Sequence, residues 1–234
     1  MLNKNIVSFL GCDAEYDEAR VVLFGAPFDS TTSFRPGTRF AGPAIRGDSW
    51  GLETYSPYQD RDLTDCHIFD SGDLELAIGD SEKVLAVIEE RAETILKDDK
   101  LPFLIGGEHL VTLGSIRAAA RKYPDLHIIH LDAHTDLRED YLGVRLSHAC
   151  VIRRCWEIWG TEGFISLEFV LEKRMSLNGR NQDIQACTHL IWKGWKRQWN
   201  LLKENRFILR WIWMYWIRRS FREQGRRSRE ELII

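Results

Sequence analysis

Histidine and aspartate side chains gather in two short segments of this 234-residue chain. The stretch HLDAHTDLREDY contains Asp132, His134 and Asp136, and the stretch GGEHL places His109 directly after a double glycine and a glutamate. Alternate residues of an extended segment point the same way, so Asp132, His134 and Asp136 can converge on one point. Imidazole nitrogen together with carboxylate oxygen suits a divalent ion of the manganese or zinc type better than calcium, which prefers oxygen alone. The spacing therefore predicts a metal site, in which a shared carboxylate could bridge two ions.

Other polar residues near strand ends carry weaker signals. Asp70 and Asp73 fall in DSGDL, where a turn or a role in supporting a ligand is expected. His127 and His130 lie within an apolar strand pattern, which predicts a structural role for both. His189 has no motif around it and is assigned no function.

Strand-like and helical segments alternate along the first 136 residues. Apolar spacing predicts strands within residues 19–27, 66–74, 101–109 and 125–136, and helices within residues 81–100 and 110–123. This alternation is typical of βαβ units around a parallel sheet. Ligands of such sheets bind beyond the carboxyl ends of the strands, which is where the histidine and aspartate clusters fall.

Composition is that of an ordinary globular protein. The net charge of −3 and the hydrophobic fraction of 44% imply no strongly charged partner. Five cysteines form no C-x-x-C pair, which favours a reducing compartment. The N-terminal stretch lacks a secretory pattern, and no apolar run is long enough to span a membrane. We therefore expect a cytoplasmic protein with no membrane or nucleic-acid partner.

Four stretches resemble the ureohydrolases, the family of arginase, agmatinase and their relatives. These are residues 25–46 (GAPFDSTTSFRPGTRFAGPAIR), 70–74 (DSGDL), 106–114 (GGEHLVTLG) and 130–149 (HLDAHTDLREDYLGVRLSHA). The first stretch looks most like the agmatinase branch, and Glu108 stands where the family signature GGDH has aspartate. The resemblance implies a three-layer α/β fold with a central parallel sheet, truncated here and confined to residues 1–161. It also implies a pair of Mn²⁺ ions.

The resemblance also implies roles for single residues. His109, Asp132 and Asp136 would hold one ion, Asp132 would bridge, and His134 would hold the second. A water between two such ions is a nucleophile at neutral pH, and Asp136 and His148 are the expected catalytic residues, with His148 moving protons near the substrate. The implied reaction is hydrolysis of the guanidinium compound agmatine to urea and putrescine, a step of polyamine biosynthesis. Guanidinobutyrase and arginase activities remain open alternatives, and the intact family implies a homo-oligomer.

Composition changes abruptly near residue 161. All six prolines precede that point, and most of the nine tryptophans lie at or beyond residue 156. Residues 161–234 hold 15 lysines and arginines against 8 acidic residues. The family's third metal-binding element, S-x-D-x-D-x-x-D-P, is absent from the chain. Residues 162–234 therefore resemble no true domain of the family.

The stretch RWIWMYWIRRS, residues 210–220, indicates why the third metal-binding element is absent. Trp is encoded by TGG and Ile by codons that begin AT, so a reading frame shifted by one base turns each Trp-Ile junction into GAT, which is aspartate. The shifted peptide reads D-[LM]-D-V-L-D, which restores the missing element. We therefore predict a reading-frame break near residues 160–162, an out-of-frame and poorly ordered tail, an incomplete metal site and impaired activity. The alternative is a metal-binding α/β domain whose basic, aromatic tail binds nucleic acid or a membrane surface.

Overall fold

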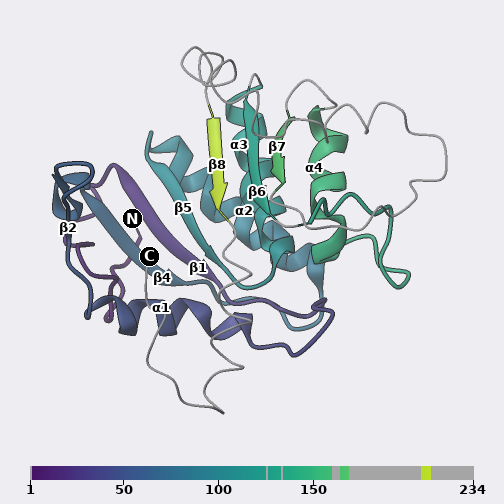
Figure 1. Cartoon of the computed structure of the whole chain (residues 1–234), viewed down its shortest axis with the longest axis horizontal. Helices are drawn as coiled ribbons and strands as arrows, with labels where there is room; N and C mark the ends of the chain where they lie inside the picture. The colour runs from purple at the N-terminus through teal and green to yellow at the C-terminus, as the bar shows by residue number, and fades with distance from the viewer. Residues whose placement is uncertain (1, 125, 133, 160–163, 169–206, 212–234) are drawn as a thin grey trace. The chain divides into compact units, whose positions relative to one another are not determined.

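The computed structural model describes residues 2–124, 126–132, 134–159, 164–168 and 207–211 (Figure 1). These residues fall into two compact units. The first comprises residues 1–126 and 136–160, and the second comprises residues 127–135 and 161–234. Each unit contains its own three-stranded parallel sheet, so the parallel α/β class predicted from the sequence is confirmed.

The sheet of the first unit has β1 (Val21–Ala26) at its centre, between β4 (Ile68–Asp73) and β5 (Leu101–Gly106). Both neighbours run parallel to β1. Val22 and Phe24 of β1 are fully buried, as is Phe69 of β4. A central strand that is buried on both faces needs a continuous apolar run, and VVLFGA supplies one.

Helices cover both faces of this sheet. The connection from β1 to β4 contains α1 (Ala41–Ser49), and the return connection from β4 to β5 contains α2 (Ser81–Lys97). Parallel crossovers are right-handed, so connections that run in opposite directions place their helices on opposite faces, as Figure 1 shows for α1 and α2. The remaining helices of the unit are α3 (Thr112–Lys122) and α4 (Val151–Trp159).

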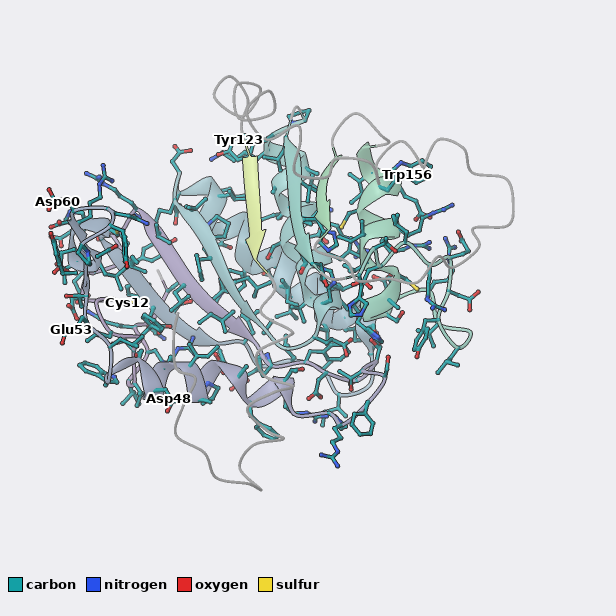
Figure 2. All side chains as sticks on the ribbon, in the orientation of Figure 1. Cys12, Asp48, Glu53, Asp60, Tyr123 and Trp156 are labelled. Carbon is teal, nitrogen blue, oxygen red and sulfur yellow. The ribbon has the colours of Figure 1, made fainter. Side chains whose placement is uncertain are left out.

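Helix α2 supplies much of the core. Its apolar residues recur at helical spacing, and Val84, Leu85, Ile88 and Ile95 are completely buried. Figure 2 draws the side chains of the described residues on the ribbon. The helix begins at Ser81 as predicted, but the capping side chain is Asp80, which accepts a hydrogen bond from the Lys83 amide at 3.1 Å.

Short elements complete the first unit. An antiparallel pair joins β2 (Tyr55–Ser56) to β3 (Arg61–Asp62). Single 3-10 turns are η1 (Thr38–Phe40), η2 (Leu63–Cys66), η3 (His109–Val111) and η4 (His148–Cys150). Turns η3 and η4 each begin at a histidine that the sequence assigns to the site.

The sheet of the second unit has β6 (His127–Asp132) at its centre, between β7 (Phe164–Glu168) and β8 (Phe207–Trp211). The extended segment expected over residues 125–136 is too long, because β6 ends at Asp132. The aspartate element obtained by shifting the frame falls mostly on residues 212–217, which lie outside the described residues, as does most of the predicted tail.

Candidate metal centre

A tight backbone turn places His109 at the end of β5. The amide of Gly107 donates to the Ala26 carbonyl at 2.9 Å, and the amide of Glu108 donates to the Phe28 carbonyl at 2.7 Å. A Cβ atom on Gly107 would lie 1.9 Å from the Phe28 oxygen, so only glycine allows this approach. Gly107 thus allows the GGEH turn to pack against the end of β1 and the residues that follow it.

His109 contacts Asp136 across 27 residues of sequence. The Nδ1 atom of His109 lies 2.5 Å from Oδ2 of Asp136, and both residues are buried. Asp136 has a φ of 48°, a left-handed conformation that aspartate tolerates better than most residues. Its carbonyl accepts hydrogen bonds from the amides of Ile152 and Arg153 at 3.1 and 3.3 Å. Amides in the first turn of a helix lack partners within the helix, and here two of them stabilise the backbone that presents the Asp136 carboxylate.

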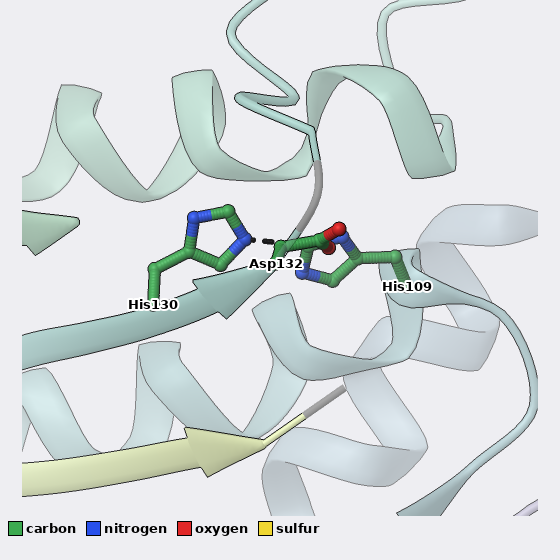
Figure 3. A group of neighbouring side chains, drawn as sticks. All are labelled: His109, His130 and Asp132. Atoms are coloured by element: carbon green, nitrogen blue, oxygen red, sulfur yellow. Dashed lines mark ion pairs between the residues drawn. The ribbon is translucent and has the colours of Figure 1, made fainter. Parts of the chain in front are cut away.

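The end of β6 carries a second group of candidate ligands, within the second unit. Asp132 is buried, and its Oδ2 lies 3.5 Å from Nε2 of His130 (Figure 3). Its Oδ1 lies 3.5 Å from Nδ1 of His134 and accepts a hydrogen bond from the His134 amide at 3.0 Å. Burial acts to raise the pKa of Asp132, but His130 and His134 outweigh it, and the pKa lies below its usual value. The His134 side chain is half exposed, whereas the side chains of His130 and Asp132 are buried.

His130 lies beside the candidate ligand Asp132, a contact that the sequence argument did not anticipate. It is fully buried, as a structural histidine would be, but it faces the Asp132 carboxylate instead of only apolar neighbours. The signal was the spacing of two, which places His130 and Asp132 on the same side of one strand. Imidazoles beside ligating carboxylates commonly fix the orientation of the ligand.

The donor atoms in both units suit a transition-metal ion. Ligand atoms lie about 2 Å from such an ion and hence about 3 Å from one another. The separations of 2.5 Å in the His109 pair and 3.5 Å in the two Asp132 pairs are close to this value. Nitrogen and oxygen donors in combination fit a divalent transition-metal ion.

His148 begins η4 and lies in the first unit. Its Nε2 is 2.9 Å from the Ser33 hydroxyl and its Nδ1 is 3.4 Å from the Thr31 hydroxyl. The ring of Tyr141 packs edge-on against the imidazole, with centroids 5.3 Å apart. The stretch after β1 and the loop after Asp136 therefore both contact the expected proton-transfer residue.

Glu108 is buried and accepts two hydrogen bonds from Thr31. The Thr31 amide donates to Oε2 at 2.8 Å and its hydroxyl donates to Oε1 at 2.6 Å. Burial raises the pKa of Glu108, although the hydrogen bonds from Thr31 oppose that effect. The glutamate in the GGEH turn thus fixes the stretch that contacts His148.

Asp70 and Asp73 bind an arginine. Arg46 of α1 forms two hydrogen bonds with Asp70, from Nε at 2.8 Å and from Nη2 at 3.0 Å, and it also pairs with Asp73. Arg46 and Asp70 are both buried. These contacts join α1 to β4, and the turn or ligand-supporting role expected from the sequence stays a prediction.

Comparison with known proteins assigns the family. The sequence profile described as the arginase family matches residues 19–179, which is more than half of the chain. The chain belongs to the arginase family. Among its relatives is the agmatinase of Bacillus subtilis (strain 168), which is 49% identical over 158 residues that cover 68% of this chain and 54% of that protein.

Other members of the arginase family are more distant. The N(1)-aminopropylagmatine ureohydrolase of Thermococcus kodakarensis is 35% identical over 172 residues, which cover 73% of this chain and 58% of that protein. The crystal structure of agmatine ureohydrolase of Thermoplasma volcanium superimposes with a TM-score of 0.73 at 28% identity and covers 88% of this chain and 70% of that one. The chain thus spans little more than half the length of these curated relatives.

Among the described residues, no helix is both long and apolar enough to cross a lipid bilayer.

Proposed function

We propose that this chain is an agmatinase-like ureohydrolase that binds two Mn²⁺ ions and hydrolyses the guanidinium group of agmatine to urea and putrescine. The observation that carries the proposal is the contact between His109 and Asp136, which joins two separate family motifs through a nitrogen and an oxygen donor. The named relatives that act on agmatine or its derivatives support the choice of substrate. Guanidinobutyrate and arginine are the alternative substrates.

We further propose that the residues matching the family's motifs, His109, Asp132, His134 and Asp136, bind the two ions. Asp132 and Asp136 are four residues apart, so the connecting chain spans at most about 14 Å. Asp132 is buried and its two oxygens lie beside two imidazoles, those of His130 and His134, which supports a role for this carboxylate in holding the ions. His109 and Asp136 would complete the first ion's ligands, and His134 would bind the second.

The proposed chemistry is an attack of water on the guanidinium carbon. The bound ions would lower the pKa of that water, which makes it nucleophilic near neutral pH. Addition of the water oxygen to the guanidinium carbon would give a tetrahedral intermediate, which collapses to urea as its bond from carbon to the amine nitrogen breaks; the water loses one proton and the leaving nitrogen gains one. His148 would supply the proton that the leaving nitrogen needs, since imidazole titrates near neutral pH. Thr31, Ser33 and Tyr141 would orient its ring.

We propose that residues from about 161 onward are read out of frame, so that the chain lacks two carboxylate ligands and has reduced activity. The codon argument for residues 211–217 supports this proposal, together with the loss of proline and the gain of tryptophan. Too little negative charge between two dications weakens their binding. Resequencing codons 155–165 tests the proposal, and C-terminal peptides in mass spectrometry that match one uninterrupted genomic frame through Ile234 would refute it.

The decisive assay is urea release from agmatine with added Mn²⁺. It compares this chain with a version in which the shifted frame is restored, and it uses arginine and 4-guanidinobutyrate as matched substrates. We expect the restored form to prefer agmatine and to exceed this chain by at least about 100-fold. A restored form that releases no urea from any of the three substrates would refute the enzymatic proposal. Equal rates in both forms would refute only the frame proposal.

A further inference from the structure

A chain of hydrogen bonds runs from Glu108 through Thr31 to His148, entirely within the first unit. The Thr31 hydroxyl donates to Glu108 at 2.6 Å, and the same oxygen accepts from the His148 amide at 3.0 Å. It also lies 3.4 Å from Nδ1 of His148. On the far side of the ring, Nε2 lies 2.9 Å from the Ser33 hydroxyl.

The direction of these hydrogen bonds follows from donor and acceptor chemistry. A carboxylate can only accept, and a threonine hydroxyl has a single proton. The proton that Thr31 gives to Glu108 is therefore unavailable to His148, so the Thr31 oxygen faces the imidazole as an acceptor. An acceptor beside Nδ1 favours the tautomer with its proton on that nitrogen.

We propose that Glu108 is a positioning residue that acts through Thr31 to hold neutral His148 in the tautomer protonated at Nδ1. Nε2 then carries the lone pair and accepts a hydrogen bond from the Ser33 hydroxyl. This inference rests on the proposed function only for the role of His148 in proton transfer, to which it adds the nitrogen that exchanges the proton. The glutamate of the GGEH turn thus connects the turn that contains His109 to the residue proposed to transfer protons.

The variant Glu108→Gln reverses the chain of hydrogen bonds in a predictable way. The Thr31 amide must still donate, so the glutamine oxygen has to face it, and the glutamine NH₂ group has to face the hydroxyl. The hydroxyl proton is then free to point at Nδ1 of His148. We expect this variant to move the imidazole proton to Nε2. Thr31→Ser keeps the hydroxyl and serves as the conservative control.

The tautomer is measured by long-range ¹H–¹⁵N NMR spectra of the whole chain, about two pH units above the ordinary histidine pKa. The spectrum of His148→Asn assigns the resonance. We expect a protonated Nδ1 in the unmodified chain and in Thr31→Ser, and a protonated Nε2 in Glu108→Gln. Circular dichroism confirms that each variant is folded.

A protonated Nε2 in the unmodified chain would overturn the proposal without reference to any variant. An unchanged tautomer in folded Glu108→Gln would overturn it as well. The spectra need neither metal nor substrate, so they separate this inference from the proposed function. A chain that releases no urea can still show the expected tautomer. A chain that releases urea can show the other tautomer, which would overturn only this inference.

Discussion

The Nδ1 atom of His109 lies 2.5 Å from Oδ2 of Asp136 although 27 residues separate them. The first residue follows β5, and the second follows the segment that leaves β6. Their contact shows that the chain between the two motifs, which includes α3, returns to the edge of the sheet from which it started. The motifs that contain His109 and Asp136 lie apart in the sequence and meet at these two side chains.

Removing either partner should weaken metal binding. We expect His109→Asn and Asp136→Asn each to reduce Mn²⁺ affinity by at least about 10-fold, because each substitution removes one ligand atom from the centre. Asparagine tolerates the left-handed backbone of residue 136, so the loss should not come from strain. Electron paramagnetic resonance of free Mn²⁺ measures the affinity. The exposed His67→Asn is the control, and equal affinities in all four proteins would contradict the assignment.

A methyl group at Gly107 should disrupt the turn that presents His109. We expect Gly107→Ala to lower the free energy of unfolding by more than about 3 kcal/mol, since the added Cβ would lie 1.9 Å from the Phe28 oxygen. Gly47→Ala is the matched control, because a Cβ in that position of α1 meets nothing within 4 Å and alanine favours a helix by up to about 1 kcal/mol. Urea denaturation measures both. Similar unfolding free energies for the two variants would count against the close approach.

Asp29 should make the stability of the chain sensitive to acid. Its buried carboxylate accepts from the amides of Gly37 and Arg39 and pairs with the Arg39 guanidinium. Burial acts to raise the pKa of Asp29, but the hydrogen bonds to Arg39 and Gly37 outweigh it, so the pKa is depressed. A depressed pKa gives stabilisation that is present above the unfolded value of about 4 and is lost as the pH falls through the folded value.

We therefore expect Asp29→Asn to cost about 2 kcal/mol at pH 7 and progressively less on acidification. Chemical denaturation at a series of pH values measures the difference from the unmodified chain. The exposed Asp48→Asn should show almost no change at any of them. A cost that stays constant down to the acid limit would show that the charge of Asp29 is not what stabilises this loop.

Cysteine reactivity should follow burial. Burial, together with nearby Asp70, raises the pKa of the Cys12 thiol to about 12, and burial also raises the pKa of Cys150. Cys66 is exposed. Because the thiolate is the reactive form, iodoacetamide near pH 8 should label Cys66 well before Cys12 or Cys150. Peptide mass spectrometry reports the order, and early labelling of Cys12 in the folded chain would contradict its burial.

Local patterns were sufficient to predict the three strands of the first sheet and helices α2 and α3, whereas α1, α4 and the β2–β3 pair were not predicted. The strands β1 and β5 are short apolar runs, β4 begins with an apolar pair and ends at Asp73, and α2 has the helical spacing of a buried face. Such signals depend on neighbouring residues alone. The candidate ligands His109 and Asp132 could be proposed from the sequence for the same reason, since Asp132 ends β6 and His109 lies three residues after β5.

Features that depend on distant segments were not predictable. The extended run expected through Asp136 fails because the amides of α4 bind the Asp136 carbonyl and hold that residue in a left-handed conformation. The contact between Glu108 and Thr31 joins residues 77 positions apart, and no local pattern encodes it. The contact of His130 with Asp132 could have been expected from their spacing of two, but the apolar strand pattern favoured a structural role instead.

The hydrogen bonds from Ile152 and Arg153 to the Asp136 carbonyl also set an order of events during synthesis. A nascent chain that has left the ribosome only as far as His148 contains every candidate ligand but lacks the amides that fix Asp136. The carboxylate can adopt its final position only after the first turn of α4 has emerged. The proposed frame break lies downstream of that turn, so this closing step is available to the nascent chain whichever frame follows.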